Sequence, residues 1–146
     1  MRTVSKMGLA GLRLGYLAGP AEWIAEIDKV RLPYNINALT QASATLALRH
    51  RPLFDAQTAI IRAERTRLFT ALASLAGVHP YPTEANFILL HLTGGRADAV
   101  FAGLRARGVL VKNLHGAHPL LAECLRVTVG RPEENAAFLS ALADQL

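Results

Sequence analysis

Apolar residues recur along the chain with two different periods, and the change comes near residue 77. From residue 21 to about residue 76, they return every three to four positions, which is the period of a helix with one buried face. This spacing predicts a helix at residues 21–31 and a longer helical region at residues 38–76. Pro52 should divide the longer region in two, because the residue before a proline is pushed out of the α conformation. Gly77 should end the second helix.

Two β-favouring segments stand at the amino end, at residues 2–5 and 12–18, and flank a glycine-rich turn at residues 6–11. They can pair with each other, but a pair of strands leaves open edges. We therefore expect the two segments to belong to a larger structure that supplies neighbouring strands.

The last seventy residues alternate short β-favouring segments with helical ones. This alternation predicts an α+β fold, in which helices cover one small sheet. The expected strands are 86–92, 108–112 and 124–129, and the expected helices are 96–107 and 132–146. Among the large aromatic side chains, we interpret Trp23 and Phe87 as core or packing residues.

The composition is that of a globular domain, with 51% hydrophobic and 18% charged residues. No apolar run approaches the roughly 18 residues that a membrane span needs, and no signal-peptide pattern is present. We therefore expect no membrane association.

A single cysteine, Cys124, excludes an internal disulfide and a cysteine-built zinc site, which favours a reducing, cytoplasmic compartment. His115 and His118 are spaced like metal ligands but lack further ligands nearby, so we expect no metal site.

The charge is +5 and the sequence pI is about 10.0, which favours anionic partners without naming one. Nucleic acid, a membrane surface and phosphorylated metabolites all fit such a charge. The chain lacks a stripe of lysines and arginines with interleaved aromatic residues. We therefore expect no nucleic-acid partner, and a non-catalytic basic binding module remains only as an alternative.

Lys6 is the first candidate for covalent chemistry, because it lies between a β-favouring segment and a glycine-rich turn. Schiff-base formation needs an amine on a rigid element, partly removed from water. Arg13 offers a fixed fork to a phosphate, and the hydroxyls of Thr3 and Ser5 could bind the same oxygens. Taken alone, these residues are a weak signal, because a lysine with a nearby arginine is more often a solvated surface pair.

Residues 2–16, RTVSKMGLAGLRLGY, resemble the cofactor-binding segment of histidinol-phosphate aminotransferases, a branch of the fold-type I pyridoxal-phosphate enzymes. The resemblance implies that Lys6 holds pyridoxal 5'-phosphate covalently. It implies that Thr3 and Arg13 bind the cofactor phosphate, with Ser5 as a weaker candidate. This sequence has one residue fewer between the lysine and the arginine than many family members have.

Three further stretches resemble the same family in the same order: residues 30–42, 84–89 and 124–135. In the family, the first of these forms a loop near the active site of the partner subunit, so Tyr34 and Asn35 become candidate substrate-binding residues. The arginine of the third stretch, Arg126, corresponds to the residue that grips the substrate carboxylate. An arginine in an apolar strand is costly unless it is paired, so an internal salt bridge is the alternative.

The resemblance implies a catalytic activity and a domain organisation. The reaction would be amino transfer from glutamate to imidazole-acetol phosphate, a phosphorylated imidazole ketone, in histidine biosynthesis, carried out by a homodimer. Residues 1–36 would be a remnant of the large cofactor-binding domain of this α/β fold. Residues 37–146 would be the carboxy-terminal small domain with the interdomain helices. A related fold-type I aminotransferase or lyase with another substrate is the alternative.

Two departures from the family pattern lead to expectations. The family's other cofactor-binding residues precede the lysine, and Lys6 leaves no room for them. We therefore expect a truncation beginning at an internal methionine, and a polypeptide that alone is not a competent aminotransferase. Arg131 stands where the family usually has a threonine. The loss of that cap should cost about 1 kcal/mol of helix stability.

Overall fold

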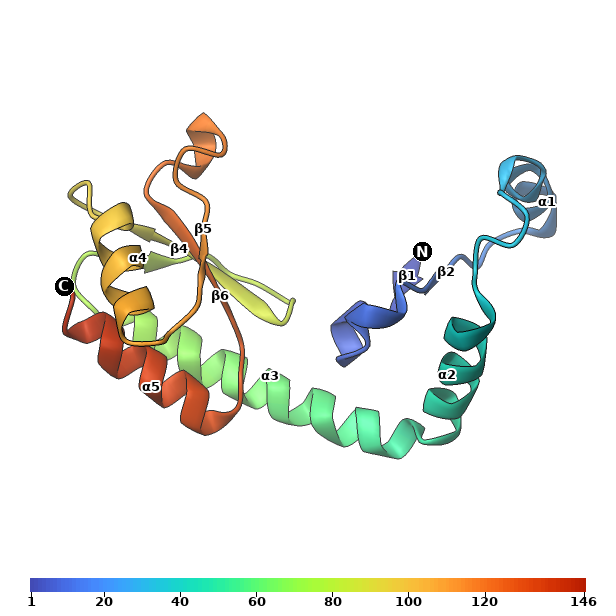
Figure 1. Cartoon of the computed structure of the whole chain (residues 1–146), viewed down its shortest axis with the longest axis horizontal. Coiled ribbons are helices and arrows are strands. Elements are labelled where there is room, and N and C mark those ends of the chain that lie inside the picture. Colours follow the sequence, from blue (N-terminus) through green and yellow to red (C-terminus); the bar gives the residue numbers. More distant parts are fainter. The chain divides into compact units, whose positions relative to one another are not determined.

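The computed structural model describes all 146 residues, and they form two compact units, residues 1–58 and 59–146 (Figure 1). None of the helices is both long and apolar enough to cross a membrane. The domain boundary expected after residue 36 does not coincide with the division between these two units, and it stays a prediction.

Unit 1 holds a small two-stranded sheet, two short 3-10 helices and the first α-helices. The segments expected as strands at 2–5 and 12–18 are mostly not strands. A 3-10 helix takes up Val4 and Ser5, and a second one ends at Leu12 before the left-handed Arg13. The elements in chain order are β1 (Arg2–Thr3), η1 (Val4–Met7), η2 (Ala10–Leu12), β2 (Gly15–Tyr16), α1 (Ala21–Val30), α2 (Ala38–Arg49) and α3 (Arg51–Ala73), which continues into unit 2.

β1 and β2 pair in an antiparallel fashion, with Thr3 opposite Gly15. The approach is close: a Cβ atom on Gly15 would lie 2.9 Å from the carbonyl oxygen of Arg2. Real side chains do not tolerate such a contact with backbone, so only glycine allows this pairing.

The break predicted near Pro52 is confirmed, because α2 ends at Arg49 and α3 begins at Arg51. Pro52 lies in the first turn of α3, where its missing N–H leaves no helical bond unmade. At the other end of α2, the side chain of Asn37 caps the helix by accepting a hydrogen bond from the Thr40 N–H at 2.9 Å.

The interpretation of Trp23 as a core residue is wrong for unit 1, since this side chain is 68% exposed. Ile27 and Val30 on the same helix are 47% and 81% exposed. The helical spacing was correct, but an apolar stripe is buried only where another element covers it, and unit 1 provides no such cover. Phe87, the second residue interpreted in this way, is half-buried in unit 2.

Unit 2 is a four-stranded antiparallel sheet with helices on one face (Figure 1), which confirms the α+β prediction. The strand order is β3 (Val78–Pro80), β4 (Phe87–Leu92), β6 (Cys124–Thr128) and β5 (Lys112–Asn113). The segment expected as a strand at 108–112 forms a ladder only at its end, and β3 was not predicted. The elements are β3 (Val78–Pro80), β4 (Phe87–Leu92), α4 (Ala97–Ala106), β5 (Lys112–Asn113), η3 (Pro119–Leu121), β6 (Cys124–Thr128) and α5 (Pro132–Ala143).

The core of unit 2 lies between one face of the sheet and helices α3, α4 and α5. Along β4, alternate side chains are buried, as expected for a sheet with one covered face. The side chains exposed by 1% or less include Ile88, Leu90, Leu92 and Leu125 from the sheet, and Leu68, Leu72, Leu104 and Leu142 from the helices. The other face of the sheet is the open face. It carries Phe87, Leu89 and His91 of β4 and their partners Thr128, Arg126 and Cys124 of β6.

A polar cluster ties α3 to the end of β6. Asn135 is 2% exposed, and its side chain accepts from the Gly130 N–H at 2.9 Å and donates to the Gly130 carbonyl at 3.0 Å. The same amide donates to Glu64 at 2.8 Å, and Arg67 pairs with Glu64 at 2.7 Å. These bonds to Arg67 and Asn135 hold the pKa of Glu64 below its ordinary value.

Arg131 occupies the cap position of α5, and its side chain cannot accept a hydrogen bond from the helix. Glu134 partly compensates: its carboxylate accepts from the Arg131 N–H at 2.8 Å and pairs with the guanidinium at 3.1 Å. Both bonds to Arg131 lower the pKa of Glu134. The missing acceptor is as expected, and its cost in stability stays a prediction.

The close approach at Gly15 leads to a first prediction. Gly15→Ala should separate β1 from β2, because the new Cβ would overlap the Arg2 carbonyl. Hydrogen exchange of the Val4 N–H, which donates to the Leu14 carbonyl at 3.2 Å, should therefore become faster. Gly11→Ala is the matched control, because no heavy atom lies within 4 Å of its Cβ position. Equal exchange in both variants would contradict the role of Gly15.

The lowered pKa values of Glu64 and Glu134 lead to a second prediction. Their folded-state pKa lies below the unfolded value near 4.5, so the stability they contribute is complete above that pH and is lost as the pH falls through the folded value. Chemical unfolding at several pH values between about 6 and 3 measures the loss. Glu64→Gln and Glu134→Gln should each flatten the pH dependence. Slopes identical to that of the unaltered chain would rule the prediction out.

Candidate cofactor and substrate site

Lys6 lies in the 3-10 helix η1, which Gly8 ends with a left-handed φ of 85°. The sequence-based expectation had placed this lysine at the end of a longer strand. In unit 1 the Lys6 side chain is exposed. The removal from water that Schiff-base chemistry favours is therefore not supplied by unit 1 alone.

The hydroxyls of Thr3 and Ser5 lie next to each other at the start of η1. Their oxygens are 2.9 Å apart, and Thr3 Oγ1 accepts a hydrogen bond from the Ser5 N–H at 3.2 Å. The Thr3 hydroxyl is also 3.2 Å from the Leu14 carbonyl. The turn thus brings two of the predicted phosphate-binding hydroxyls together and holds Thr3 beside the residue that follows Arg13.

Arg13 has a left-handed backbone with a φ of 50°, and its guanidinium donates to the Ala10 carbonyl at 3.3 Å. The side chain is exposed, and a guanidinium carries five donors. Most of these donors are therefore available for an anion. Two hydroxyls and a guanidinium on one tight turn form a donor set that suits the phosphate of pyridoxal 5'-phosphate.

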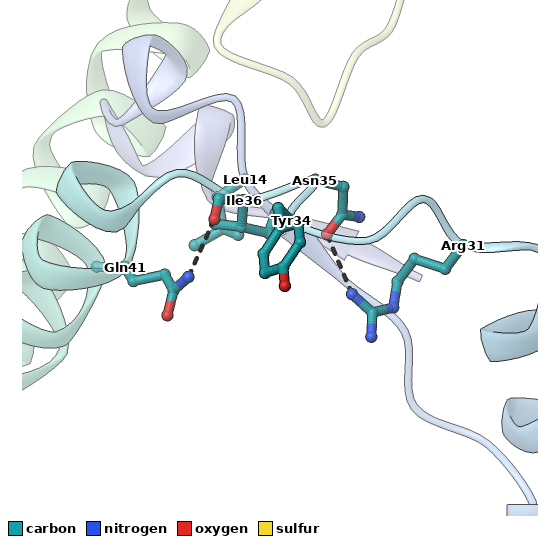
Figure 2. A pocket seen from close by; sticks show the side chains of 7 residues that line it. Leu14, Arg31, Tyr34, Asn35, Ile36 and Gln41 are labelled. Carbon is teal, nitrogen blue, oxygen red and sulfur yellow. Dashed lines mark hydrogen bonds between the residues drawn. The ribbon is translucent and has the colours of Figure 1, made fainter.

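Tyr34 and Asn35 line an open pocket of about 520 Å³ in unit 1 (Figure 2). Asn35 accepts a hydrogen bond from Arg31 at 3.2 Å, and Gln41 donates to the Ile36 carbonyl at 3.0 Å. Tyr34 has a φ of 57° and is 97% exposed, so its ring makes little contact within the unit. A bulky residue with positive φ is strained, which makes this loop a functional candidate.

Arg126 lies on the open face of unit 2, opposite Leu89 on β4 and Lys112 on β5. The side chain is exposed, and its guanidinium carbon is 5.0 Å from the centre of the Phe87 ring. The expectation of a costly arginine within an apolar strand is therefore wrong, because Leu125 and Val127 on either side of Arg126 face the core while Arg126 itself is exposed. None of the ion pairs in the structure involves Arg126, so the alternative of an internal salt bridge is also wrong.

Lys112 is a residue whose place the sequence did not reveal. It stands at the end of the strand expected at residues 108–112, and the structure places it in β5 directly across from Arg126. Like charges directly opposite each other destabilise a sheet unless something neutralises them. The only signal in the sequence was a lysine after an apolar run, and pairing between distant strands cannot be read from that.

Seven residues were predicted for the site, and the structure groups them within the two units. Unit 1 holds Thr3, Ser5, Lys6, Arg13, Tyr34 and Asn35, and unit 2 holds Arg126. No group of three or more possible metal ligands is present. The histidines weighed as ligands have local roles: His118 Nδ1 accepts from the Leu120 N–H at 3.2 Å, and His115 Nδ1 lies 3.0 Å from Glu123.

Known proteins resemble the whole chain. Histidinol-phosphate aminotransferase 1 of Ralstonia nicotianae is 58% identical over 146 residues, which are 100% of this chain and 38% of that protein. Among solved structures, histidinol-phosphate aminotransferase from Sinorhizobium meliloti in complex with pyridoxal-5'-phosphate has a TM-score of 0.80 and 27% identity. The match covers 99% of this chain and 40% of that one. L-threonine-O-3-phosphate decarboxylase from Porphyromonas gingivalis has a TM-score of 0.79 and 28% identity, covering 94% of this chain and 42% of that one.

The chain thus spans 38% of the length of the Ralstonia relative. The structural similarities confirm that the fold is part of the fold-type I architecture. Residues 1–142 match the family described as aminotransferase class I and II. Because this match covers nearly the whole chain, the chain belongs to the aminotransferase class I and II family.

Proposed function

We propose that the protein containing this chain transfers an amino group between glutamate and imidazole-acetol phosphate, with pyridoxal 5'-phosphate as cofactor. The observation that carries the proposal is the 58% identity, over the whole chain, to a histidinol-phosphate aminotransferase. The donor set at residues 3–13 supports it. Lys112 and Arg126 on the open face, which form no ion pair, support it too. The pathway would be histidine biosynthesis.

Each proposed cofactor ligand in unit 1 has a role that its chemistry suits. Thr3, Ser5 and Arg13 would bind the phosphate through hydroxyl and guanidinium donors. Lys6 would hold the cofactor covalently through Nζ and later move a proton to and from the substrate α-carbon. When bound, pyridoxal 5'-phosphate supplies the electron sink for the reaction, and the protein positions it.

The open face of unit 2 would bind the acidic groups of the substrates. Arg126 can present two parallel N–H donors to a carboxylate, and Lys112 adds a second positive charge beside it. Glutamate and the phosphorylated ketone both carry anionic groups. Two adjacent cations suit such ligands, and a bound anion would relieve their mutual repulsion.

The loop with Tyr34 and Asn35 would serve the active site of a second subunit in a homodimer. This proposal follows the family pattern, and the exposure of Tyr34 is compatible with it. The same pattern supports residues 1–36 as part of the large domain and 37–146 as the small domain of the parent enzyme.

A second candidate is a phosphorylated amino acid decarboxylase of the same fold. The structural match to L-threonine-O-3-phosphate decarboxylase favours it. Its 28% identity is about half of the 58% to the aminotransferase, so we place amino transfer first. Both activities would use the same lysine and the same anion-binding residues.

The role of Lys6 can be tested by trapping the cofactor on the full chain. After incubation with pyridoxal 5'-phosphate and reduction with borohydride, mass spectrometry should find the label mainly on Lys6, because the nearby donors hold the phosphate. Lys29 and Lys112, the other two lysines of the chain, are internal controls. Arg13→Ala should reduce the selectivity. Equal labelling of the three lysines would contradict the proposed site.

The position of Lys112 opposite Arg126 in the sheet leads to a prediction with two effects of opposite sign, one on anion binding and one on stability. Lys112→Thr should weaken the binding of inorganic phosphate by about fivefold, since one charged donor is lost. The same change should raise the free energy of unfolding at low salt by about 0.2–1 kcal/mol, because it removes a like-charge pair. NMR titration and chemical unfolding measure the two effects, with Lys29→Thr as the control. Unchanged phosphate binding would eliminate Lys112 from the site.

A further inference from the structure

The Arg126 guanidinium rests on an aromatic ring and not on an acid. Its central carbon lies 5.0 Å from the centre of the Phe87 ring. Phe87 pairs with Thr128 and Leu89 pairs with Arg126, so Phe87 and Arg126 are diagonal neighbours on the open face. Aromatic side chains can bridge this diagonal spacing. The contact therefore follows from the strand register.

The choice of an aromatic partner matters for the donors of Arg126. The arginines of unit 2 that form ion pairs direct their N–H groups at carboxylates; they are Arg65, Arg67, Arg107 and Arg131. The Phe87 ring attracts the cation through its π face and offers no carboxylate oxygen to occupy the five N–H donors of the guanidinium. The edge of the Arg126 guanidinium thus stays available as a fork for a planar carboxylate.

Phe87 is well placed to act as a fixed support. Its neighbour on β4, Ile88, is fully buried in the core. On the other side, the Asn86 carbonyl accepts a hydrogen bond from the Val129 N–H at 2.9 Å. The backbone that carries the ring is therefore held at both sides, whereas Arg126 has a long and flexible side chain.

We propose that Phe87 is a positioning residue, which orients the guanidinium fork of Arg126 for the carboxylate of the substrate. This inference rests on the proposed carboxylate-binding role of Arg126. The ring acts through the arginine and need not touch the substrate. By restricting the rotamers of Arg126 beforehand, it reduces the entropy lost when the carboxylate binds.

The experiment uses NMR of arginine Nε–H groups in the full chain, with glutarate as the probe. Phe87→Leu should remove the ring-current shift of the Arg126 Nε–H and weaken glutarate binding by about threefold, as expected for an exposed cation–π contact. Phe87→Tyr, which keeps the ring, should preserve both. Phe101→Leu is the matched control, since Phe101 packs against the core and should leave Arg126 unchanged. Phe87→Met repeats the test if the leucine variant does not fold.

An unchanged Nε–H shift and unchanged glutarate affinity in Phe87→Leu would overturn the inference, as would an equal effect of Phe101→Leu. Arg126→Ala separates this inference from the proposed function. If Arg126→Ala binds glutarate as well as the unaltered chain does, the carboxylate-binding role of Arg126 fails. If only Phe87→Leu has no effect, that role stands and the positioning role of Phe87 fails.

Discussion

The antiparallel pairing of β4 with β6 is the constraint on which the chemistry of unit 2 depends. Five residue pairs join these central strands, from Phe87 with Thr128 to His91 with Cys124. Because side chains alternate between the faces, burial of Ile88 and its partner Val127 places Arg126 on the open face. A slip of one residue would turn the arginine toward the core, where an unpaired charge is very costly. Core packing thus fixes the direction of the charged side chain.

The end of β6 is held by a different kind of interaction. Asn135 satisfies both backbone groups of Gly130 and connects them to Glu64 on α3. A buried amide with all these partners stabilises the unit, and the loss of any one partner would leave a polar group unsatisfied. The strand that carries Arg126 is therefore secured along its length by apolar packing and at its end by hydrogen bonds.

Local features of the sequence predicted much of this fold. A proline located the break between α2 and α3, and the period of apolar residues located β4, β6 and the helices around them. The pairing of Lys112 with Arg126 was not predictable, because register between distant strands leaves no local pattern. The exposure of Trp23 could not be foreseen either, since a periodic stripe shows which face is apolar but not what covers it. The candidate site was predicted from a sequence motif, whereas the hydrogen bonds among its residues are seen only in the structure.

The two units differ in how firmly they can hold a functional group. Every buried apolar side chain of the chain, from Leu68 to Leu142, belongs to unit 2. In unit 1 the only buried residue is Thr40, and Trp23, Ile27 and Val30 of α1 are exposed. The turn around Lys6 therefore depends on its own hydrogen bonds and on the tight packing at Gly15. Since a reactive amine needs a rigid and partly dry setting, the chemistry proposed for Lys6 requires further apolar surface to cover unit 1, whereas the fork of Arg126 is already supported by its own sheet.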